Sequence, residues 1–164
     1  DTLEQSTQPF TSLEENIHHL ERYISIEKIR FDNFKYTINL DKLLIPSEIQ
    51  LPPMLLQPLV ENAIWHGLQP IPGEKILNIS FIKKDNSLLC IIEDNGIGLN
   101  RSIENKQRTN NHQSIAVENI NKRISLLNEK FILSYKLEMA DKSGMHGYAG
   151  SGTVVTLTIP LIRD

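Results

Sequence analysis

A nearly continuous apolar run, Leu88–Ile92, constrains the fold more than any other feature of the sequence. Such a run fits a central strand, which we expect to extend over Leu88–Asp94. The segment Ile76–Lys83 before it also has the pattern of a strand, and residues 84–87 (KDNS) between the two are typical of a tight hairpin turn. The rest of the chain must therefore supply further strands and helices that surround this hairpin.

The first helix is predicted to begin at a capping box, in which the side chains of Ser12 and Glu15 each accept a hydrogen bond from the backbone N–H of the other residue. It runs to about Phe31, and its apolar residues recur at heptad-like spacings: Leu13, Ile17, Leu20 and Ile24. This apolar seam either packs on the body of the same chain or forms a dimer or interdomain contact. The sequence leaves both alternatives open.

Two further helices are predicted downstream. One opens near Pro52, because proline suits the first turn of a helix, and stops at Gly67. Pro58 lies inside it and is expected to loosen or kink its first turns. Residues 100–113 are polar and rich in asparagine, and we expect them to form a mobile loop before the other helix, at about 115–130.

The remaining strands are predicted from alternation of apolar and polar residues, which is the pattern of a half-buried strand. They lie at 34–40, 133–140 and 155–159. The resulting order is helix, strand, helix, strand, strand, helix, strand, strand. Hairpins on both sides of a helix imply a mixed sheet with helices on one face, which is a two-layer α/β sandwich.

Composition excludes several classes of protein. The chain has 164 residues and a net charge of −3, which fits a soluble domain and gives no basic footprint for nucleic acid. Its single cysteine, Cys90, excludes an internal disulfide and a multi-cysteine metal site. No apolar stretch approaches the roughly 20 residues that span a bilayer, and the polar start has no signal peptide. We expect a cytoplasmic piece of a longer chain, without membrane contact of its own.

Glycines gather in two places and point to where the chemistry lies. Gly96 and Gly98 follow the central strand. The second cluster precedes the last strand and comprises Gly144, Gly147, Gly150 and Gly152. Glycine permits unusual backbone angles or the close approach of a ligand, although hairpin geometry alone is an alternative for the second cluster. Neither cluster has the Walker or the Rossmann spacing, so those nucleotide-binding folds do not explain them.

Three segments together resemble the ATP-binding motifs of the GHKL ATPases, the superfamily of gyrase, heat-shock chaperones, MutL and histidine kinases. Residues 59–67 (LVENAIWHG) are similar to the N-box, 93–98 (EDNGIG) to the first glycine box and 150–153 (GSGT) to the last. The longer segment 56–67 most resembles LytS-like sensor histidine kinases. Residues 21–31 resemble the segment that those kinases carry just before the ATPase domain.

The resemblance implies a Bergerat-type ATP-binding domain at 32–164, preceded by a lead-in and linker helix at 1–31. It implies catalytic roles for Asn62, whose amide oxygen suits Mg²⁺, and for Glu61, as an acceptor or water-orienting base. Asp94 is expected to accept a hydrogen bond from the exocyclic amine of adenine.

The other expected ATP contacts surround these residues. His66 lies one helical turn after Asn62 and is expected to touch phosphate, with a capping or surface role as the alternative. The remaining contacts are Gly96, Gly98, Ser114, Ile115, Ala116, Gly150, Gly152 and Thr153. The stretch Ser114–Val117 replaces a Gly-x-Gly-Leu-like sequence of the family, but backbone N–H groups at a helix start still suit an anion. No cationic phosphate contact is expected at Trp65, where many histidine kinases have a lysine.

The expected function is that of a catalytic and ATP-binding fragment of a two-component sensor histidine kinase. It binds Mg-ATP and transfers the γ-phosphoryl group to a histidine outside this chain, for passage to an aspartate of a response regulator. The chain lacks a PHFLFN-like acceptor motif, so it is not expected to phosphorylate itself. Expected partners are the acceptor-histidine dimerisation region and the response regulator, in a homodimeric parent that is an integral membrane protein. The alternatives are a nucleotide-dependent binding module without transfer activity and an anti-sigma-type serine kinase.

Overall fold

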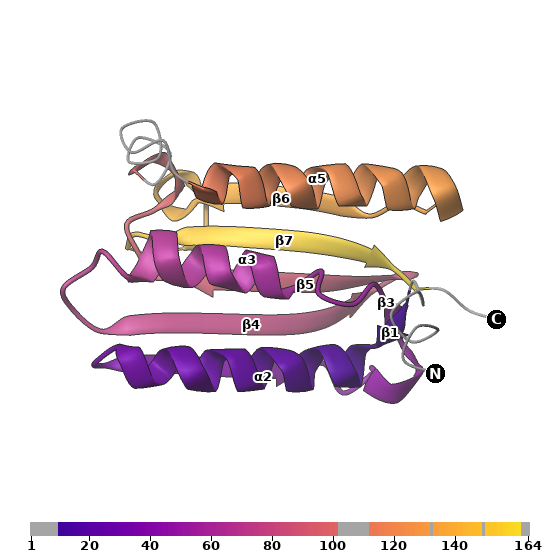
Figure 1. Cartoon of the computed structure of the whole chain (residues 1–164), viewed down its shortest axis with the longest axis horizontal. Helices are drawn as coiled ribbons and strands as arrows, with labels where there is room; N and C mark the ends of the chain where they lie inside the picture. The colour runs from indigo at the N-terminus through magenta and orange to yellow at the C-terminus, as the bar shows by residue number, and fades with distance from the viewer. Residues whose placement is uncertain (1–9, 102–111, 132, 149, 162–164) are drawn as a thin grey trace.

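The computed structural model describes residues 10–101, 112–131, 133–148 and 150–161, which form a mixed five-stranded sheet covered by helices on one face (Figure 1). The strand order is β2-β4-β5-β7-β6. The strands are β2 (Phe34–Leu40), β4 (Lys75–Lys84), β5 (Ser87–Asp94), β6 (Lys136–Asp141) and β7 (Thr153–Pro160). β2 runs parallel to β4, and the other neighbours are antiparallel. β5 is thus the central strand, as its apolar run predicts.

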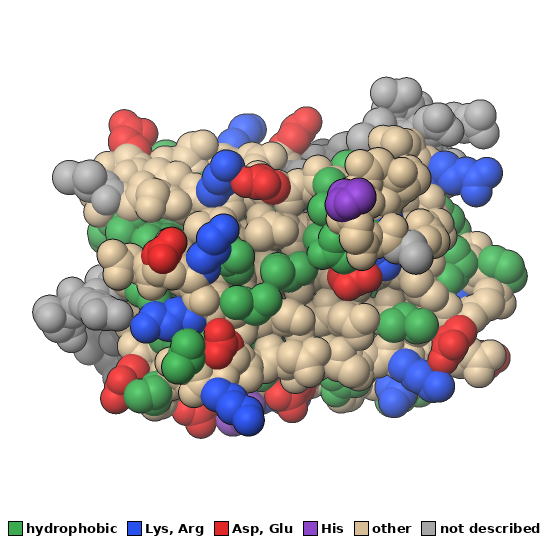
Figure 2. All heavy atoms as spheres, turned by 180° about the vertical axis from the view of Figure 1, so that it is seen from behind, with side chains coloured by type: hydrophobic (Ala, Val, Ile, Leu, Met, Phe, Trp, Pro, Cys, Tyr) green, Lys and Arg blue, Asp and Glu red, His purple; other side chains and the backbone are tan. Residues whose placement is uncertain are grey.

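The helices form the second layer. They are α2 (Leu13–Arg30), α3 (Gln57–Asn62) and α5 (His112–Phe131), and Figure 1 shows them side by side in front of the sheet. The core fills the space between the two layers. Figure 2 shows the opposite face, where acidic and basic side chains are scattered among hydrophobic and uncharged polar ones. The predicted two-layer α/β sandwich is therefore confirmed.

Short elements complete the described part of the chain. β1 (Thr11–Ser12) pairs antiparallel with β3 (Gln50–Leu51) in a small separate sheet that the sequence pattern did not predict. Two turns of 3-10 helix follow β2 and β6, at η1 (Pro46–Glu48) and η3 (Lys142–Gly144). Among the described helices, none combines the length and the apolar character that crossing a membrane requires.

α2 begins where the capping box predicts. Ser12 Oγ accepts a hydrogen bond of 3.1 Å from the backbone N–H of Glu15. The seam of this helix packs on the chain's own core, because Leu13, Leu20 and Ile24 are at most 1% exposed. Of the two alternatives for the seam, packing on the body of the same chain is confirmed. The division of the chain at residue 31 stays a prediction.

α3 differs from its predicted helix at both ends. It begins at Gln57 rather than near Pro52, since Met54 has a φ of 60°, which a right-handed helix does not allow. Pro58 therefore lies in the first turn, where no N–H group is needed, and the predicted kink there is wrong. The helical backbone continues beyond α3 as the π-helical segment η2 (Ala63–Leu68), so it ends one residue after the predicted stop at Gly67.

The alternation of residues predicts a strand from Leu133, but β6 begins at Lys136. Asn128 on α5 explains the difference. Its Nδ2 donates to the backbone oxygen of Tyr135 at 3.0 Å, and its Oδ1 accepts from the backbone nitrogen of Tyr135 at 2.8 Å. Because both backbone groups of Tyr135 bond to one side chain, they do not join the sheet.

The predicted loop at 100–113 is wrong at both of its ends. Residues 99–101 are helical, and α5 already begins at His112. The interior of the predicted loop, residues 102–111, lies outside the described residues.

Candidate functional site

Asp94, the last residue of β5, is the buried centre of the candidate site. Its side chain is 2% exposed, and its Oδ1 accepts hydrogen bonds from the backbone N–H groups of Gly96 at 2.9 Å and Thr153 at 3.3 Å. Among the described residues, none donates to Oδ2. The carboxylate is thus fixed by the two predicted glycine segments while one oxygen keeps its capacity to accept a hydrogen bond.

The pKa of Asp94 reflects this environment. Burial raises it from 3.8 to about 6, against the lowering effect of the N–H groups of Gly96 and Thr153. The nearby charge of Lys142 also lowers the pKa, and that of Glu93 raises it. A buried carboxylate whose charged form is this poorly solvated gains from any donor that reaches its remaining oxygen.

Three glycines pack directly around Asp94. A Cβ atom on Gly67 would lie 2.8 Å from Asp94 Oδ1. A Cβ atom on Gly96 would overlap the backbone of Gly67, and one on Gly152 would overlap the backbone oxygen of Asp94. The three motifs that are separate in the sequence therefore meet at this carboxylate. The lack of side chains at Gly96 and Gly152 is explained by contacts within the protein, whatever space a ligand also needs.

The other two predicted glycines differ from each other. Gly98 has a φ of 92°, and a Cβ atom there would lie 2.6 Å from Asp141 Oδ2. Gly150 has a φ of 82°, and no atom of the described residues lies within 4 Å of its hypothetical Cβ. Both residues thus need glycine for their backbone conformation, and only Gly150 has open space beside it.

α3 and η2 carry the three remaining N-box residues. The Oδ1 atom of Asn62 is buried and has no hydrogen-bond partner among the described residues. Glu61 Oε1 accepts a hydrogen bond of 3.0 Å from Gln57 Nε2, one turn earlier on the same helix. His66 is 8% exposed, so the alternative of a surface histidine is wrong. An unpaired buried oxygen is costly, and at Asn62 this cost is consistent with a ligand that the amide oxygen would bind.

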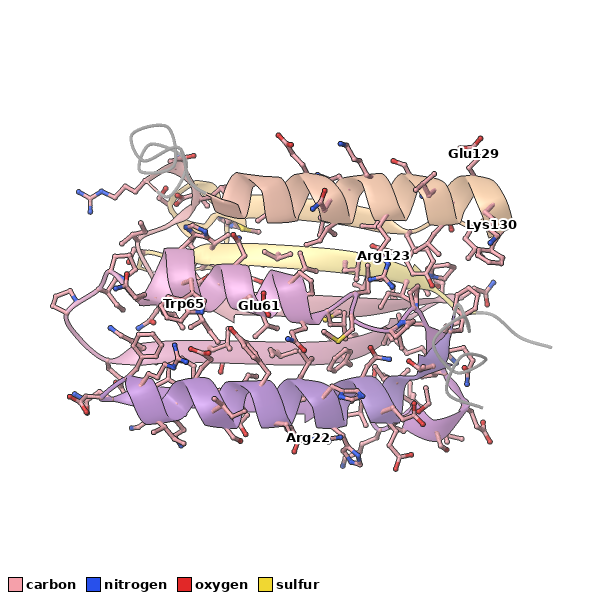
Figure 3. The ribbon with its side chains drawn as sticks, in the orientation of Figure 1. Arg22, Glu61, Trp65, Arg123, Glu129 and Lys130 are labelled. Atoms are coloured by element: carbon pink, nitrogen blue, oxygen red, sulfur yellow. The ribbon has the colours of Figure 1, made fainter. Side chains whose placement is uncertain are left out.

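Trp65 lies on the side of α3 and η2 that faces α2, as Figure 3 shows together with Glu61. Its ring packs edge-on against Phe31 at 5.7 Å between centroids and forms a hydrogen bond with the Tyr23 hydroxyl. Arg30 lies over the same ring at 6.0 Å. Trp65 therefore joins the N-box segment to α2.

The stretch Ser114–Ala116 lies near the beginning of α5, and its side chains lie outside the described part of the structure. Farther along the same helix, Arg123 donates a hydrogen bond to the backbone oxygen of Pro53. This contact connects α5 with the segment that leads into α3.

Three residues that sequence reasoning did not single out hold the site together. Asn95 Oδ1 accepts from the N–H of Ile76 at 2.8 Å, and Asn95 Nδ2 donates to the backbone oxygen of Glu74 at 2.8 Å. Asn95 thus ties the first glycine box to the start of β4, and its position between Asp94 and Gly96 was the available signal. Asp141, the last residue of β6, and Lys142, the first residue of η3, had no such signal in the sequence.

The chain is similar in sequence to known sensor kinases. No family model matches the chain. The chain is 35% identical over 152 residues to the sensor protein LytS of Oceanobacillus iheyensis, a match that covers 87% of this chain and 25% of the relative. It is 31% identical over 154 residues to the sensor histidine kinase BtsS of Escherichia coli, covering 92% of this chain and 24% of that protein. The chain thus spans about a quarter of the length of these relatives.

Solved structures share the fold. The catalytic domain of the histidine kinase ThkA matches with a TM-score of 0.61 at 17% identity, covering 93% of this chain and 94% of that one. The histidine kinase AdeS of Acinetobacter baumannii matches with a TM-score of 0.58 at 14% identity, covering 94% of this chain and 67% of that one.

The chain has the fold of histidine kinase catalytic domains and is similar in sequence to sensor kinases of the LytS type. The particular type follows from the sequence matches and from the motifs at 59–67, 93–98 and 150–153. The chain is similar to the catalytic domain of the LytS-like sensor histidine kinases, and the predicted resemblance is confirmed.

Proposed function

We propose that this domain binds Mg-ATP and transfers its γ-phosphoryl group to a histidine outside the chain. The observation that carries the proposal is Asp94, a carboxylate 2% exposed that is fixed through Oδ1 and keeps Oδ2 as an acceptor. The exocyclic amine of adenine is a donor of the right kind for that oxygen. The flanking backbone at Gly96, Gly98, Gly150, Gly152 and Thr153 forms the walls on which the base lies.

The phosphates extend from the base toward α3 in this proposal. The buried and unpartnered Oδ1 of Asn62 is a hard oxygen of the type that Mg²⁺ prefers, so the residue fits a metal ligand. Bound Mg²⁺ would neutralise charge that develops on the phosphates during transfer. His66 contacts phosphate, and the backbone N–H groups of the first turn of α5, which reaches Ser114, hold an anion. Because α5 begins at His112, the N–H groups of Ile115 and Ala116 bond within the helix and are not part of this proposal.

Glu61 is the proposed base or water-orienting residue. Its Oε1 is held by Gln57, which fixes the carboxylate relative to Asn62 on the same short helix. Because phosphoryl transfer depends mainly on positioning and on charge neutralisation, Glu61 and Asn62 together supply the catalytic contribution of α3.

The partners belong to the proposal as well. The acceptor is the histidine-bearing dimerisation region of a parent kinase, and the next carrier is an aspartate of a response regulator. A solved structure with a similar fold contains the kinase ThkA in complex with the response regulator TrrA. A homodimeric parent anchored in a membrane, with this domain on its cytoplasmic side, would present two such domains to the regulator.

Nucleotide affinity tests the base contact. Asp94→Asn places an amide where an acceptor is needed, and loss of a hydrogen bond to a charged group of about 1.5–3 kcal/mol weakens binding about tenfold to a hundredfold. Titration of a fluorescent ATP analogue measures this change. Asp85→Asn is the matched control, because Asp85 lies in the exposed β4–β5 turn at a φ of 55°, which asparagine tolerates. Equal affinities of Asp94→Asn and the wild type would refute the adenine contact.

Metal dependence tests the assignment of Asn62. Asn62→Ala should weaken ATP binding more in Mg²⁺ than in EDTA, since the lost oxygen is a metal ligand. An equal loss in both conditions would mean that Asn62 has a structural role only.

Phosphoryl transfer tests the reaction itself. With radiolabelled ATP and Mg²⁺, the domain should label acceptor-histidine helices of its parent that are supplied in trans, and the label should be lost in acid. Acid-stable label would favour the serine-kinase alternative. Nucleotide binding without any label would favour a binding module that lacks transfer activity.

A further inference from the structure

The segment at the end of β6 contacts both glycine segments of the site. Asp141 Oδ2 accepts a hydrogen bond of 3.1 Å from the backbone N–H of Asn100, just after the first glycine box. The same oxygen lies against Gly98, where a Cβ atom would be 2.6 Å away. Asp141 Oδ1 accepts from the backbone and the hydroxyl of Ser143, at 3.0 and 2.7 Å. Asp141 thus holds the first glycine box from one side.

Lys142, the next residue, contacts the second glycine segment. Its backbone N–H donates to the backbone oxygen of Gly152 at 2.9 Å. Its ammonium group lies 2.7 Å from Glu93 Oε1, next to Asp94 on β5. Lysine is rarely buried, yet Lys142 is only 6% exposed. One residue therefore ties the backbone beside Thr153 to the end of β5 and brings a buried positive charge close to Asp94.

We propose that Lys142 is a positioning residue of the nucleotide site, which holds the Gly152–Thr153 backbone against Asp94 and stabilises the Asp94 carboxylate in its charged, accepting form. This inference rests on the proposed function of Asp94 as the adenine acceptor. Lys142 acts on the nucleotide only through Asp94 and the backbone of Gly152, so its effect is distinct from a direct phosphate contact.

The charges around Asp94 give the inference a sharp test. From its own strand, Glu93 raises the pKa of Asp94, and from the β6–β7 connection Lys142 lowers it. From η2, the backbone of Gly67 packs on the carboxylate, next to the buried His66. Removing Lys142 or Glu93 breaks the same ion pair, but the two removals act on Asp94 in opposite directions.

The experiment is a carbon-13 NMR titration of aspartate carboxyl groups in the nucleotide-free domain, with Asp94→Asn to assign the signal. We expect Lys142→Met to raise the titration midpoint of Asp94 by about half a pH unit or more, and Glu93→Gln to lower it. Lys142→Arg, which keeps the charge, should stay close to the wild type. Lys136→Met is the matched control, because it removes an exposed lysine of the preceding strand β6, where it pairs with Glu138.

Nucleotide affinity completes the test. Lys142→Met should weaken binding of the fluorescent ATP analogue more at pH 6 than at pH 8. The nucleotide phosphates also titrate in this range, and the pH dependence of binding to Asp94→Asn measures their contribution, which is subtracted. Glu93→Gln should weaken binding less at pH 6 than Lys142→Met does, although it breaks the same ion pair.

The outcomes separate the inference from the proposed function. Midpoints that move in the same direction in both variants, or that do not move, would overturn the role of Lys142. Opposite shifts in a domain that binds no ATP would overturn the proposed function instead, because the titration is measured without nucleotide.

Discussion

Replacing Asp94 with asparagine should stabilise the domain at neutral pH while it weakens nucleotide binding. Burial raises the pKa of Asp94 from 3.8 to about 6. One pKa unit corresponds to about 1.4 kcal/mol, so ionising Asp94 in the folded protein costs about 3 kcal/mol more than in the unfolded chain. The asparagine side chain of the variant would keep an oxygen for the N–H groups of Gly96 and Thr153 without carrying a charge into the core.

The sign of the pH dependence follows from the same shift. Because the pKa is higher in the folded state, the folded protein holds the proton between about pH 4 and pH 6, whereas the unfolded chain releases it. The stability from this proton is present below pH 4 and is lost as the pH rises through 6. The variant has no such loss. The difference in the free energy of unfolding between Asp94→Asn and the wild type should therefore increase by about 3 kcal/mol, in favour of the variant, from pH 3.5 to pH 7.5.

Urea unfolding of the nucleotide-free proteins at several pH values measures this difference. Asp41→Asn is the control, because backbone N–H groups of Leu43 and Lys83 lower the pKa of Asp41. Its difference from the wild type should stay nearly constant above pH 4.5 and should change only in more acidic solution. Parallel stability curves for Asp94→Asn and the wild type across pH 4 to 7 would refute the reasoning, since they would mean that Asp94 ionises as easily in the folded state as in the unfolded one.

Three further substitutions test the packing and the caps. Gly96→Ala should destabilise the domain by about 2 kcal/mol or more in urea unfolding, because its Cβ would overlap backbone atoms, whereas Gly73→Ala, with nothing within 4 Å, should stay within about 0.5 kcal/mol. Ser12→Ala should lower the free energy of unfolding by about 1 kcal/mol, because it removes the N-cap of α2. Unchanged stability would contradict the capping role of Ser12. Asn128→Ala should lower the free energy of unfolding by about 2 kcal/mol, because two backbone groups of Tyr135 lose their hydrogen-bond partner. If the amide proton of Tyr135 still exchanged slowly in this variant, the assigned role of Asn128 would be wrong.

Local patterns predicted the elements whose cause is local. The apolar run at Leu88–Ile92 placed the central strand, because such a run can only be accommodated between neighbours. The cap at Ser12 placed the start of α2, because the partner groups lie three residues apart. The position of Asp94 at the end of β5, next to Gly96, was also predictable, since the motif is contiguous.

Features decided by distant contacts were not predictable. Pro58 looked like a kink because nothing in the sequence shows the positive φ of Met54, which delays the helix until proline lies in its first turn. Gly67 was predictable as the end of a helix but not as a contact of Asp94, because that carboxylate lies 27 residues away along the chain. Lys142 gave no signal, since its contacts with Glu93 and Gly152 depend on the pairing of three strands.

The packing around Asp94 determines which substitutions can separate folding from function. Gly67, Gly96 and Gly152 are limited to glycine by contacts among themselves and with Asp94. A side chain at any of them disturbs the fold and the nucleotide site together, so a loss of binding there does not identify a ligand contact. The buried oxygens of Asp94 and Asn62 are different, because no described residue bonds Asp94 Oδ2 or Asn62 Oδ1. Substitution at these two residues should therefore reduce nucleotide affinity while the fold is kept or even stabilised, which is the pattern expected of groups retained for a ligand.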